Sequence, residues 1–416
     1  MLAALLERPG TVTVRDIPPP RAEAGLALVR VALAGICGTD LKIAAGDIPV
    51  PAGRVLGHEM TGRVEAPGRR GVPPAGTAVL VNPAAFCGAC DLCRRDLPQL
   101  CRRGGLLGRD ADGCFAELVA VDEALLHPIP DSVAAEAAAL LQVLSTCVHA
   151  QSGLRAGPRD SAVVIGLGVT GLLHVQLLRA RGLRAIIGVT RSAWKRDLAM
   201  RFGASAVADP GEAADAVAEA TGGRGADIAI ECAGTPAALA QAIRLAGAGG
   251  TVVAFGIVAH AAELAPYEWY VKELTIRSPR AARPRDCDEA ILLCAQRRLD
   301  PAPLVTGRFP LARLPDALAA SRDPAQLKVV VDAGAGPGLP GLAEATLLEE
   351  HHADHRPVAG HLRGHAGVPG PPEDGAVRAR DPRGDGAQVR QRLLLPDHRV
   401  HAERQRAHAC RLLLPS

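Results

Sequence analysis

The sequence predicts an α/β protein built on a doubly wound parallel sheet, and the main indication is a glycine-rich unit near the middle of the chain. A short apolar run at 162–165 leads into Gly166, Gly168 and Gly171, which have the spacing G-x-G-x-x-G. A helical pattern follows, and a second apolar run at 185–189 closes the unit. Strand, glycine turn, helix and strand in this order are typical of a dinucleotide-binding unit.

The three glycines each have a physical reason in such a turn. One makes the tight turn, one lets a pyrophosphate approach the backbone, and one lets the helix pack closely on the strand. The helix that opens beside Val169 offers free N–H groups and its positive end to the phosphates. We therefore predict that Gly166, Gly168, Val169 and Gly171 bind the cofactor; a glycine-rich turn in another kind of α/β protein is the alternative.

The rest of this region alternates between strands and helices, which favours a parallel sheet with helices on both faces. Further strands are predicted at 227–231 and 251–255, and helices at 192–202, 212–220 and 236–246.

The composition divides the chain into four parts. Residues 1–143 are rich in strands and turns, with a clear strand at 26–33, and residues 144–277 hold the alternating unit. Residues 278–332, with two helical segments and a last strand, are predicted to return to the first domain. Residues 333–416 hold eight of the 13 histidines but no Ile, Phe, Tyr or Trp, so they cannot build a core and are predicted to be disordered.

One hypothesis for this tail is translation of GC-rich DNA in a shifted reading frame. Resequencing the gene across codon 333 tests it, since an unaltered frame would exclude it. A histidine-rich metal-binding segment is the alternative, although these histidines lack ligand spacing.

The overall composition favours a soluble protein with a large core. Among 416 residues, 48% are hydrophobic, and the net charge of +3 does not favour nucleic acid or a membrane as a partner. No signal peptide is predicted, and the longest uncharged stretches are interrupted by glycines. We expect a cytoplasmic protein whose eleven cysteines serve as metal ligands and free thiols rather than as disulfides.

Four of these cysteines lie in a segment that we call the cysteine lobe, residues 87–101. Cys87, Cys90, Cys93 and Cys101 have the spacing C-x2-C-x2-C-x7-C. Four converging thiolates form a closed tetrahedral zinc site, which can order a loop with little core of its own. A redox role for Cys90 and Cys93 is the alternative, but the thioredoxin-type context is missing.

A second set of metal-binding residue types is more dispersed. It consists of Cys37, Thr39 and Asp40 in one motif, C-G-T-D, and of His58 and Glu59 in another, G-H-E-x-x-G. Thiolate and imidazole are natural zinc ligands, and a catalytic zinc site takes three protein ligands and an open position. Taken singly, a buried structural cysteine and a satisfied core histidine would explain them equally well.

In combination, these motifs resemble the zinc-dependent medium-chain alcohol and polyol dehydrogenases, such as sorbitol and threonine dehydrogenases. The resemblance covers nearly all of residues 1–332, in order. It implies a Rossmann cofactor domain inserted into a GroES-like β-barrel catalytic domain that carries two zinc ions, and a homodimer or homotetramer. It further implies hydride transfer between nicotinamide and a secondary alcohol, such as a polyol, amino alcohol, sugar or cyclitol, or the corresponding ketone.

The same resemblance implies roles for individual residues. Cys37 and His58 correspond to ligands of the catalytic zinc, and Thr39 to the hydroxyl that relays the substrate proton. Asp40 corresponds to the carboxylate that orients the histidine. Glu59 corresponds to the acid beside the metal, which can approach the ion or stand back.

The sequence departs from this family at the third catalytic ligand. Polyol-type members usually supply it from a Glu-Pro pair, whereas Gln142 and Val143 stand at the matching positions. An amide oxygen binds zinc more weakly than a carboxylate does. The site is therefore expected to use Glu59 as a zinc ligand, to bind zinc less tightly, or to use the zinc ion differently.

A second departure concerns the cofactor. NAD-binding members carry an acidic residue at the end of the second strand to accept from the ribose 2′-OH, but Thr190 and Arg191 stand here. Without the carboxylate a 2′-phosphate is not repelled, and a guanidinium can bind it in a fork. We hypothesise that NADP(H) is favoured over NAD(H); a solvated arginine at a strand end is the alternative.

The remaining candidates are predicted to be structural. His127, His149 and His174 are expected to be packed or surface groups rather than ligands. The other cysteines are expected to be small buried apolar residues, namely Cys114, Cys147, Cys232, Cys287 and Cys294.

Two other functions remain open on the sequence alone. One is a zinc-free enone or quinone reductase of the same superfamily, which metal analysis would distinguish. The other is a non-catalytic nucleotide-binding protein, which would bind NADPH but turn over no alcohol.

Overall fold

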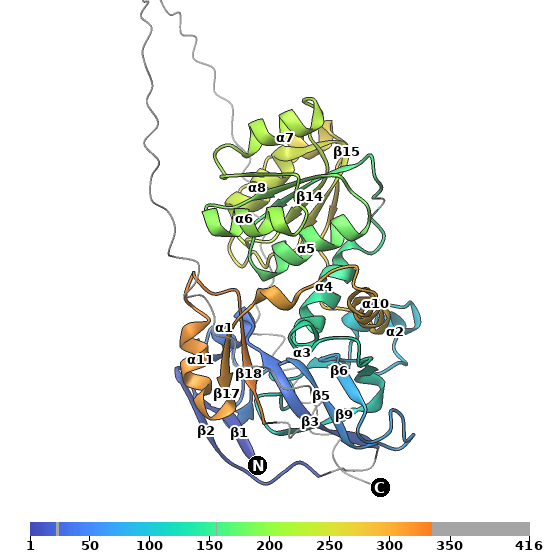
Figure 1. Ribbon diagram of the computed structural model, residues 1–416, viewed down its shortest axis with the longest axis vertical. Coiled ribbons are helices and arrows are strands. Elements are labelled where there is room, and N and C mark those ends of the chain that lie inside the picture. Colours follow the sequence, from blue (N-terminus) through green and yellow to red (C-terminus); the bar gives the residue numbers. More distant parts are fainter. Residues whose placement is uncertain (22–24, 155, 335–416) are drawn as a thin grey trace, which may run out of the picture. The chain divides into compact units, whose positions relative to one another are not determined.

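The computed structural model describes residues 1–21, 25–154 and 156–334 (Figure 1). The tail that the sequence analysis placed at 333–416 therefore lies outside the described residues, apart from its first two. Across the described ranges, none of the helices has the length and apolar character needed to span a membrane.

The first half of the chain forms mainly antiparallel strands and short helices. These elements are β1 (Leu2–Arg8), β2 (Thr11–Asp16), β3 (Leu26–Gly35), α1 (Gly38–Ala45), β4 (Arg54–Val55), β5 (Glu59–Ala66), β6 (Ala78–Val81), β7 (Ala84–Ala85), α2 (Asp91–Arg94), η1 (Pro98–Leu100), β8 (Gly105–Leu106), β9 (Leu118–Asp122), η2 (Glu123–Leu125), β10 (Leu126–Pro128), α3 (Ala135–Ala138) and α4 (Leu141–Gln151).

The middle of the chain alternates between strands and helices as predicted. These elements are β11 (Ser161–Ile165), α5 (Val169–Ala180), β12 (Ala185–Val189), α6 (Ala193–Arg201), β13 (Ala206–Ala208), α7 (Ala213–Thr221), β14 (Ala226–Glu231), α8 (Pro236–Leu245), β15 (Ala246–Ala254), α9 (Pro266–Val271) and β16 (Thr275–Arg277). The last elements are α10 (Pro284–Ala295), η3 (Ala302–Leu304), β17 (Val305–Pro310), η4 (Leu311–Arg313), α11 (Leu314–Ala320) and β18 (Lys328–Asp332).

The seven-stranded sheet, antiparallel except for the parallel pair β17 and β18, is organised around β3, whose apolar residues are almost all buried. Its strand order is β10-β6-β5-β3-β18-β17, and β9 also pairs with β3. The partner β18 comes from the far end of the described chain and places Val331 opposite Ala34 (Figure 1). Buried side chains such as Val29, Leu56 and Phe115 form the core of this part.

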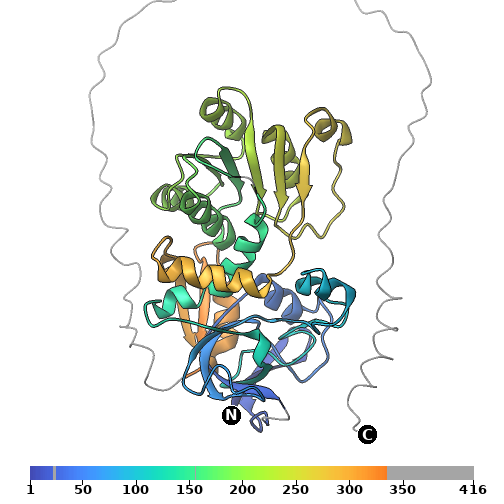
Figure 2. The same ribbon diagram turned by 90° about the vertical axis from the view of Figure 1, so that its right-hand side faces the viewer.

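The second sheet has six parallel strands in the order β13-β12-β11-β14-β15-β16. Successive residues of β11 point to opposite faces, so that Val164 packs with Leu173 of α5, whereas Val163 packs with Ile243 of α8. Both faces are therefore covered by helices, as Figure 2 shows. The predicted doubly wound fold is confirmed.

One boundary differs clearly from the prediction, because β15 begins at Ala246 rather than at 251. The added residues include three glycines, which carry no apolar side chain to mark a strand. They pair nonetheless, since Ala246 lies opposite Ala226 of β14 before an irregularity in the register.

Candidate metal centres and cofactor turn

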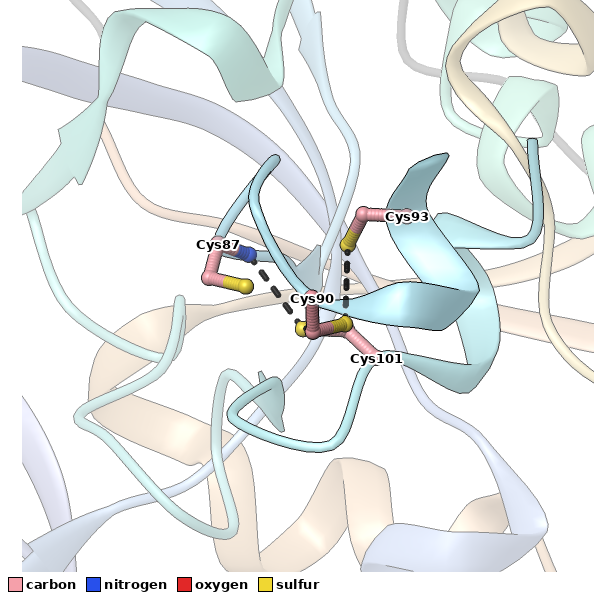
Figure 3. Close-up of side chains that lie close together, drawn as sticks. All are labelled: Cys87, Cys90, Cys93 and Cys101. Carbon is pink, nitrogen blue, oxygen red and sulfur yellow. Dashed lines mark hydrogen bonds between the residues drawn. The ribbon is translucent and has the colours of Figure 1, made fainter. Parts of the chain in front are cut away.

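The four cysteines of the cysteine lobe converge. Their sulfur atoms all lie within 4.8 Å of one another, and Figure 3 shows them turned toward a common point. Cys90 caps the short helix α2, and η1 ends immediately before Cys101, so two tight turns bring distant parts of the loop together. Four sulfur donors at this spacing fit a closed tetrahedral zinc site.

Nearby donors favour thiolates in this cluster. The backbone N–H of Ala89 is the main cause that lowers the pKa of Cys87 to about 6. The guanidinium of Arg103 also lies 3.3 Å from Cys87 Sγ. In contrast, burial and the neighbouring thiols raise the pKa of Cys93 to about 12. Thiolates this close together repel one another. A divalent cation would offset that repulsion, and it would bind the cysteines in their thiolate form.

Cys37, His58 and Glu59 form a second group, with one potential ligand atom of each within 4.8 Å of the others. Cys37 is the N-cap of α1, and Glu59 opens β5 directly after His58. The His58 and Glu59 side chains are 6% and 2% exposed, so a metal here would be largely shielded from water. Thiolate, imidazole and carboxylate together suit zinc.

Asp40 contacts both Cys37 and His58. Its Oδ2 accepts the N–H of Cys37 at 2.9 Å, and its Oδ1 lies 3.2 Å from His58 Nδ1. This arrangement leaves His58 Nε2 for a metal. Burial by itself would lower the pKa of His58, but the Asp40 carboxylate and Cys37 raise it well above its ordinary value. Thr39, beside them in the first turn of α1, is half-buried.

Lys328 is a residue of this centre that the sequence analysis missed. Its Nζ lies 2.7 Å from Glu59 Oε2 and donates to the carbonyl of Ile36 at 3.0 Å. Burial would lower the pKa of Lys328, but the Glu59 carboxylate raises it. A lysine that opens the apolar strand β18 was the available signal, because a buried ammonium requires a partner.

The packing leaves little freedom for the Glu59 carboxylate. A Cβ atom at Gly35 would lie 2.4 Å from Glu59 Oε2, so only glycine leaves room for the carboxylate in this position. Glu59 is therefore confined between the neighbouring strand and Lys328, beside Cys37 and His58.

Gln142 lies in the first turn of α4 and is buried. Its helix packs against β5, the strand that opens with Glu59. The side chain brings an amide to this position and no charge, so Glu59 is the carboxylate that lies with Cys37 and His58 among the described residues.

The glycine turn has the shape that a dinucleotide requires. Gly166 has a φ of +89°, and a Cβ at Gly171 would lie 2.0 Å from the Gly166 carbonyl oxygen. A Cβ at Gly168 would meet nothing within 4 Å, so the backbone is open to a ligand there. The helix α5 begins at Val169 without a side-chain cap, which leaves its first N–H groups for phosphate oxygens.

Positive side chains gather after β12. Arg191 is exposed and forms no ion pair with any residue in the described ranges. Lys195 lies with its Nζ 5.1 Å from the ring centroid of Trp194, and partial burial lowers its pKa. Thr190 is held by Arg196, whose Nη1 donates to the Thr190 carbonyl at 2.7 Å.

The three histidines that were expected to be structural are packed against partners. His127 Nδ1 lies 2.7 Å from Asp288, and His149 Nδ1 lies 2.8 Å from Asp286. His174 meets Phe255 edge to face, and burial lowers its pKa to about 3.

Of the cysteines expected to be structural, four are buried, but Cys232 is only half-buried. It directly follows Glu231, the last residue of β14.

Comparisons with known proteins agree with this geometry. Residues 23–131 match the family described as "Alcohol dehydrogenase GroES-like domain", and residues 169–296 match "Zinc-binding dehydrogenase". The chain is 30% identical to 2-dehydro-3-deoxy-L-galactonate 5-dehydrogenase of Pseudoalteromonas atlantica over 75% of this chain and 93% of that one. It is 28% identical to sorbitol dehydrogenase of Halalkalibacterium halodurans over 77% and 96%.

Two solved structures are similar in the same way. A zinc-binding dehydrogenase from Sinorhizobium meliloti 1021, bound to NADP, is 33% identical with a TM-score of 0.73, covering 80% of this chain and 98% of that one. An alcohol dehydrogenase from Escherichia coli CFT073, complexed with NADH, is 28% identical with a TM-score of 0.74, covering 80% and 99%.

The chain therefore belongs to the zinc-binding medium-chain alcohol dehydrogenase family, whose members use NAD(P). Within that family it is a zinc-dependent dehydrogenase of the polyol and threonine dehydrogenase type.

Proposed function

We propose that this enzyme interconverts a small secondary alcohol, of the polyol, amino alcohol, sugar or cyclitol class, and its ketone with NADP(H). The convergence of Cys37, His58 and Glu59 within 4.8 Å is the observation that carries this proposal. The relatives named above act on a polyol and on a sugar acid, which supports a hydroxyl-rich substrate.

In this proposal Cys37 and His58 hold the catalytic zinc, with Glu59 as the nearest carboxylate. When bound, the zinc ion supplies a Lewis acid at the reacting oxygen. Asp40 fixes the His58 ring and keeps Nε2 turned to the metal. Thr39, two residues beyond Cys37, takes the substrate's hydroxyl proton toward the cofactor ribose.

The second zinc is held by the four thiolates of the cysteine lobe and has no position open to substrate. These ligands are Cys87, Cys90, Cys93 and Cys101. We also propose that residues 1–143 and 278–332 form one discontinuous catalytic domain, because β18 pairs directly with β3. We expect the enzyme to be a homodimer or homotetramer, as the family resemblance implies.

Arg191 supports the choice of NADP(H). Its guanidinium lies two residues beyond the end of β12, where the ribose of a dinucleotide bound at the glycine turn would lie. Lys195 adds a second positive charge one helical turn further on.

Steady-state kinetics with the zinc-loaded enzyme test both parts of this proposal. We expect turnover on at least one member of a panel of polyols, amino alcohols and cyclitols, and a higher kcat/KM with NADPH than with NADH. Arg191→Ala should lower kcat/KM for NADPH about tenfold, since it removes a charge-assisted phosphate contact, and should leave NADH unaffected.

Each part of the proposal can fail separately. A preference for NADH would reject the cofactor assignment, and two zinc ions per chain without turnover on any alcohol would reject the enzyme assignment. Zinc-free protein that reduces enones would favour the reductase instead.

A further inference from the structure

A cavity of about 390 Å³ lies between three segments that are far apart in the sequence. Part of its wall comes from the cysteine lobe at Leu97, Gln99 and Leu100, and part from the end of α4 at His149, Ser152 and Gly153. The third part is the stretch 277–285 between β16 and α10. The last two segments are the connections by which the chain enters and leaves the six-stranded sheet.

The charged side chains that line this cavity are all positive. Four arginines line it, Arg277, Arg280, Arg283 and Arg285, and no carboxylate does. Asp286 pairs with Arg283, and Asp96 pairs with Arg285 at 2.7 Å. Arg277 and Arg280 form no ion pair with any residue that the structure describes, so about two positive charges remain uncompensated.

The back wall is held in place by a buried network. Asp286, 1% exposed, accepts from Arg283 through Nε and Nη2, both at 2.9 Å. The same carboxylate lies 2.8 Å from His149 Nδ1, and Arg283 Nη2 also donates to Ser152 Oγ at 2.8 Å. Burial would raise the pKa of Asp286, but the bonds from His149 and Arg283 hold it well below its usual range. The wall is therefore ordered without any ligand.

Neutral polar groups complete the lining. Gln99 Oε1 is buried and has no hydrogen-bond partner among the described residues, while its Nε2 lies 3.5 Å from His149 Nε2. The hydroxyl of Ser278 borders the same space, whereas that of Ser152 already donates to the His149 carbonyl at 2.8 Å. The unpaired guanidinium groups of Arg277 and Arg280, with the Ser278 hydroxyl beside them, suit an oxyanion with several oxygen atoms.

We propose that this cavity binds a small phosphate-type dianion, either free phosphate or the phosphate group of a small ester. A phosphate carries about −1.5 to −2 charges at neutral pH, which matches the two unpaired arginines. The ligand would accept from Arg277, Arg280 and the Ser278 hydroxyl, all on the stretch that leaves the six-stranded sheet, and would hold this stretch in place. Binding should then raise the Tm of the enzyme.

Isothermal titration of inorganic phosphate into the zinc-loaded full chain, at constant ionic strength, tests this site. We expect one phosphate per chain in the wild type and at least tenfold weaker binding in Arg277→Ala/Arg280→Ala. The matched control is Arg201→Ala/Arg244→Ala, which removes the same charge from exposed positions on α6 and α8 and should bind as the wild type does.

A third variant separates this site from the cofactor turn. Arg191→Ala should leave phosphate binding within twofold of the wild type. Unchanged affinity in Arg277→Ala/Arg280→Ala would overturn the proposal, as would an equal loss in the control or a loss confined to Arg191→Ala. If the double variant does not fold, the exposed Arg280→Ala alone should weaken binding several-fold and lower the phosphate-induced rise in Tm.

Two further titrations identify the source of the phosphate group. Glycerol 3-phosphate or a hexose phosphate that binds more tightly than inorganic phosphate assigns the cavity to phosphorylated metabolites. Equal or weaker binding of these esters assigns it to free phosphate. Binding of neither probe would overturn the proposal.

Discussion

The two metal centres use similar ligands in opposite ways. In the cysteine lobe, four half-buried thiols come from one short loop, and no histidine or carboxylate of the described residues belongs to the group. At the other centre, Cys37 comes from the start of α1, whereas His58 and Glu59 come from the start of β5, and Glu59 already has a buried partner in Lys328. A closed set of four thiolates serves structure, whereas a set of three protein ligands with an open position can serve a reaction.

The largest difference between the centres should be seen in catalysis. Cys37→Ser should lower kcat/KM by about 10³-fold, because the lost Lewis acid provides several kcal/mol of transition-state stabilisation. The variant should keep one zinc per chain and a Tm close to that of the wild type. Kinetics together with metal analysis check this, and activity within tenfold of the wild type would contradict the assignment of Cys37.

The Lys328–Glu59 pair predicts a loss of stability that depends on zinc. Lys328→Met should destabilise the metal-free protein by about 3–5 kcal/mol, because it leaves Glu59 charged and buried without a partner. The loss should be smaller in the zinc-loaded protein, where the metal can compensate the carboxylate. Urea unfolding of both forms measures this.

The matched control for this prediction is Lys42→Met, at an exposed position on α1, which should change neither form appreciably. An equal loss in the metal-free and zinc-loaded forms of Lys328→Met would show that Glu59 does not exchange partners.

Removing a zinc ligand from the cysteine lobe should lower the stability of the protein and leave its catalytic rate nearly unchanged. Cys93→Ser should reduce the zinc content by one ion per chain and lower the Tm by about 10 °C, since a metal that orders the loop is lost. The kcat/KM of the remaining folded protein should stay within a few-fold of the wild type. Cys232→Ser, outside both centres, is the control, and a zinc content unchanged by Cys93→Ser would argue against the four-cysteine site.

The smallest expected effect concerns Gln142. Gln142→Glu should bind the catalytic zinc about tenfold more tightly, because a carboxylate replaces an amide near the metal. Competition with a chelator gives the affinity, and Gln142→Ala should show no gain. An unchanged affinity in Gln142→Glu would place this residue outside the ligand set.

Local features of this protein were predictable from the sequence. The glycine turn, the alternation of strands and helices and the cysteine lobe each depend on residues within about 30 positions of one another. The strand β15 was partly missed because its first residues are glycines and alanines. The pattern of apolar residues carries no signal where side chains are absent.

Contacts between distant segments were not predictable. Lys328 and Glu59 are separated by 269 positions, and His149 and Asp286 by 137, so no local spacing connects them. The Asp40–His58 contact was expected only because the motifs resembled a known family. Both missed pairs consist of buried charged or polar groups whose partners come from another element.

The sequence by itself determined the fold class, the glycine turn and the four-cysteine motif, because each follows from short-range periodicity or spacing. Only the tertiary structure decided which partner Glu59 takes, and that four arginines face one cavity. These features arise where β18 pairs with β3 and where the connections beside α4 and α10 meet. The physical reason is that a buried charge must be compensated by whatever the folded chain brings near it, and chain distance places no limit on that choice.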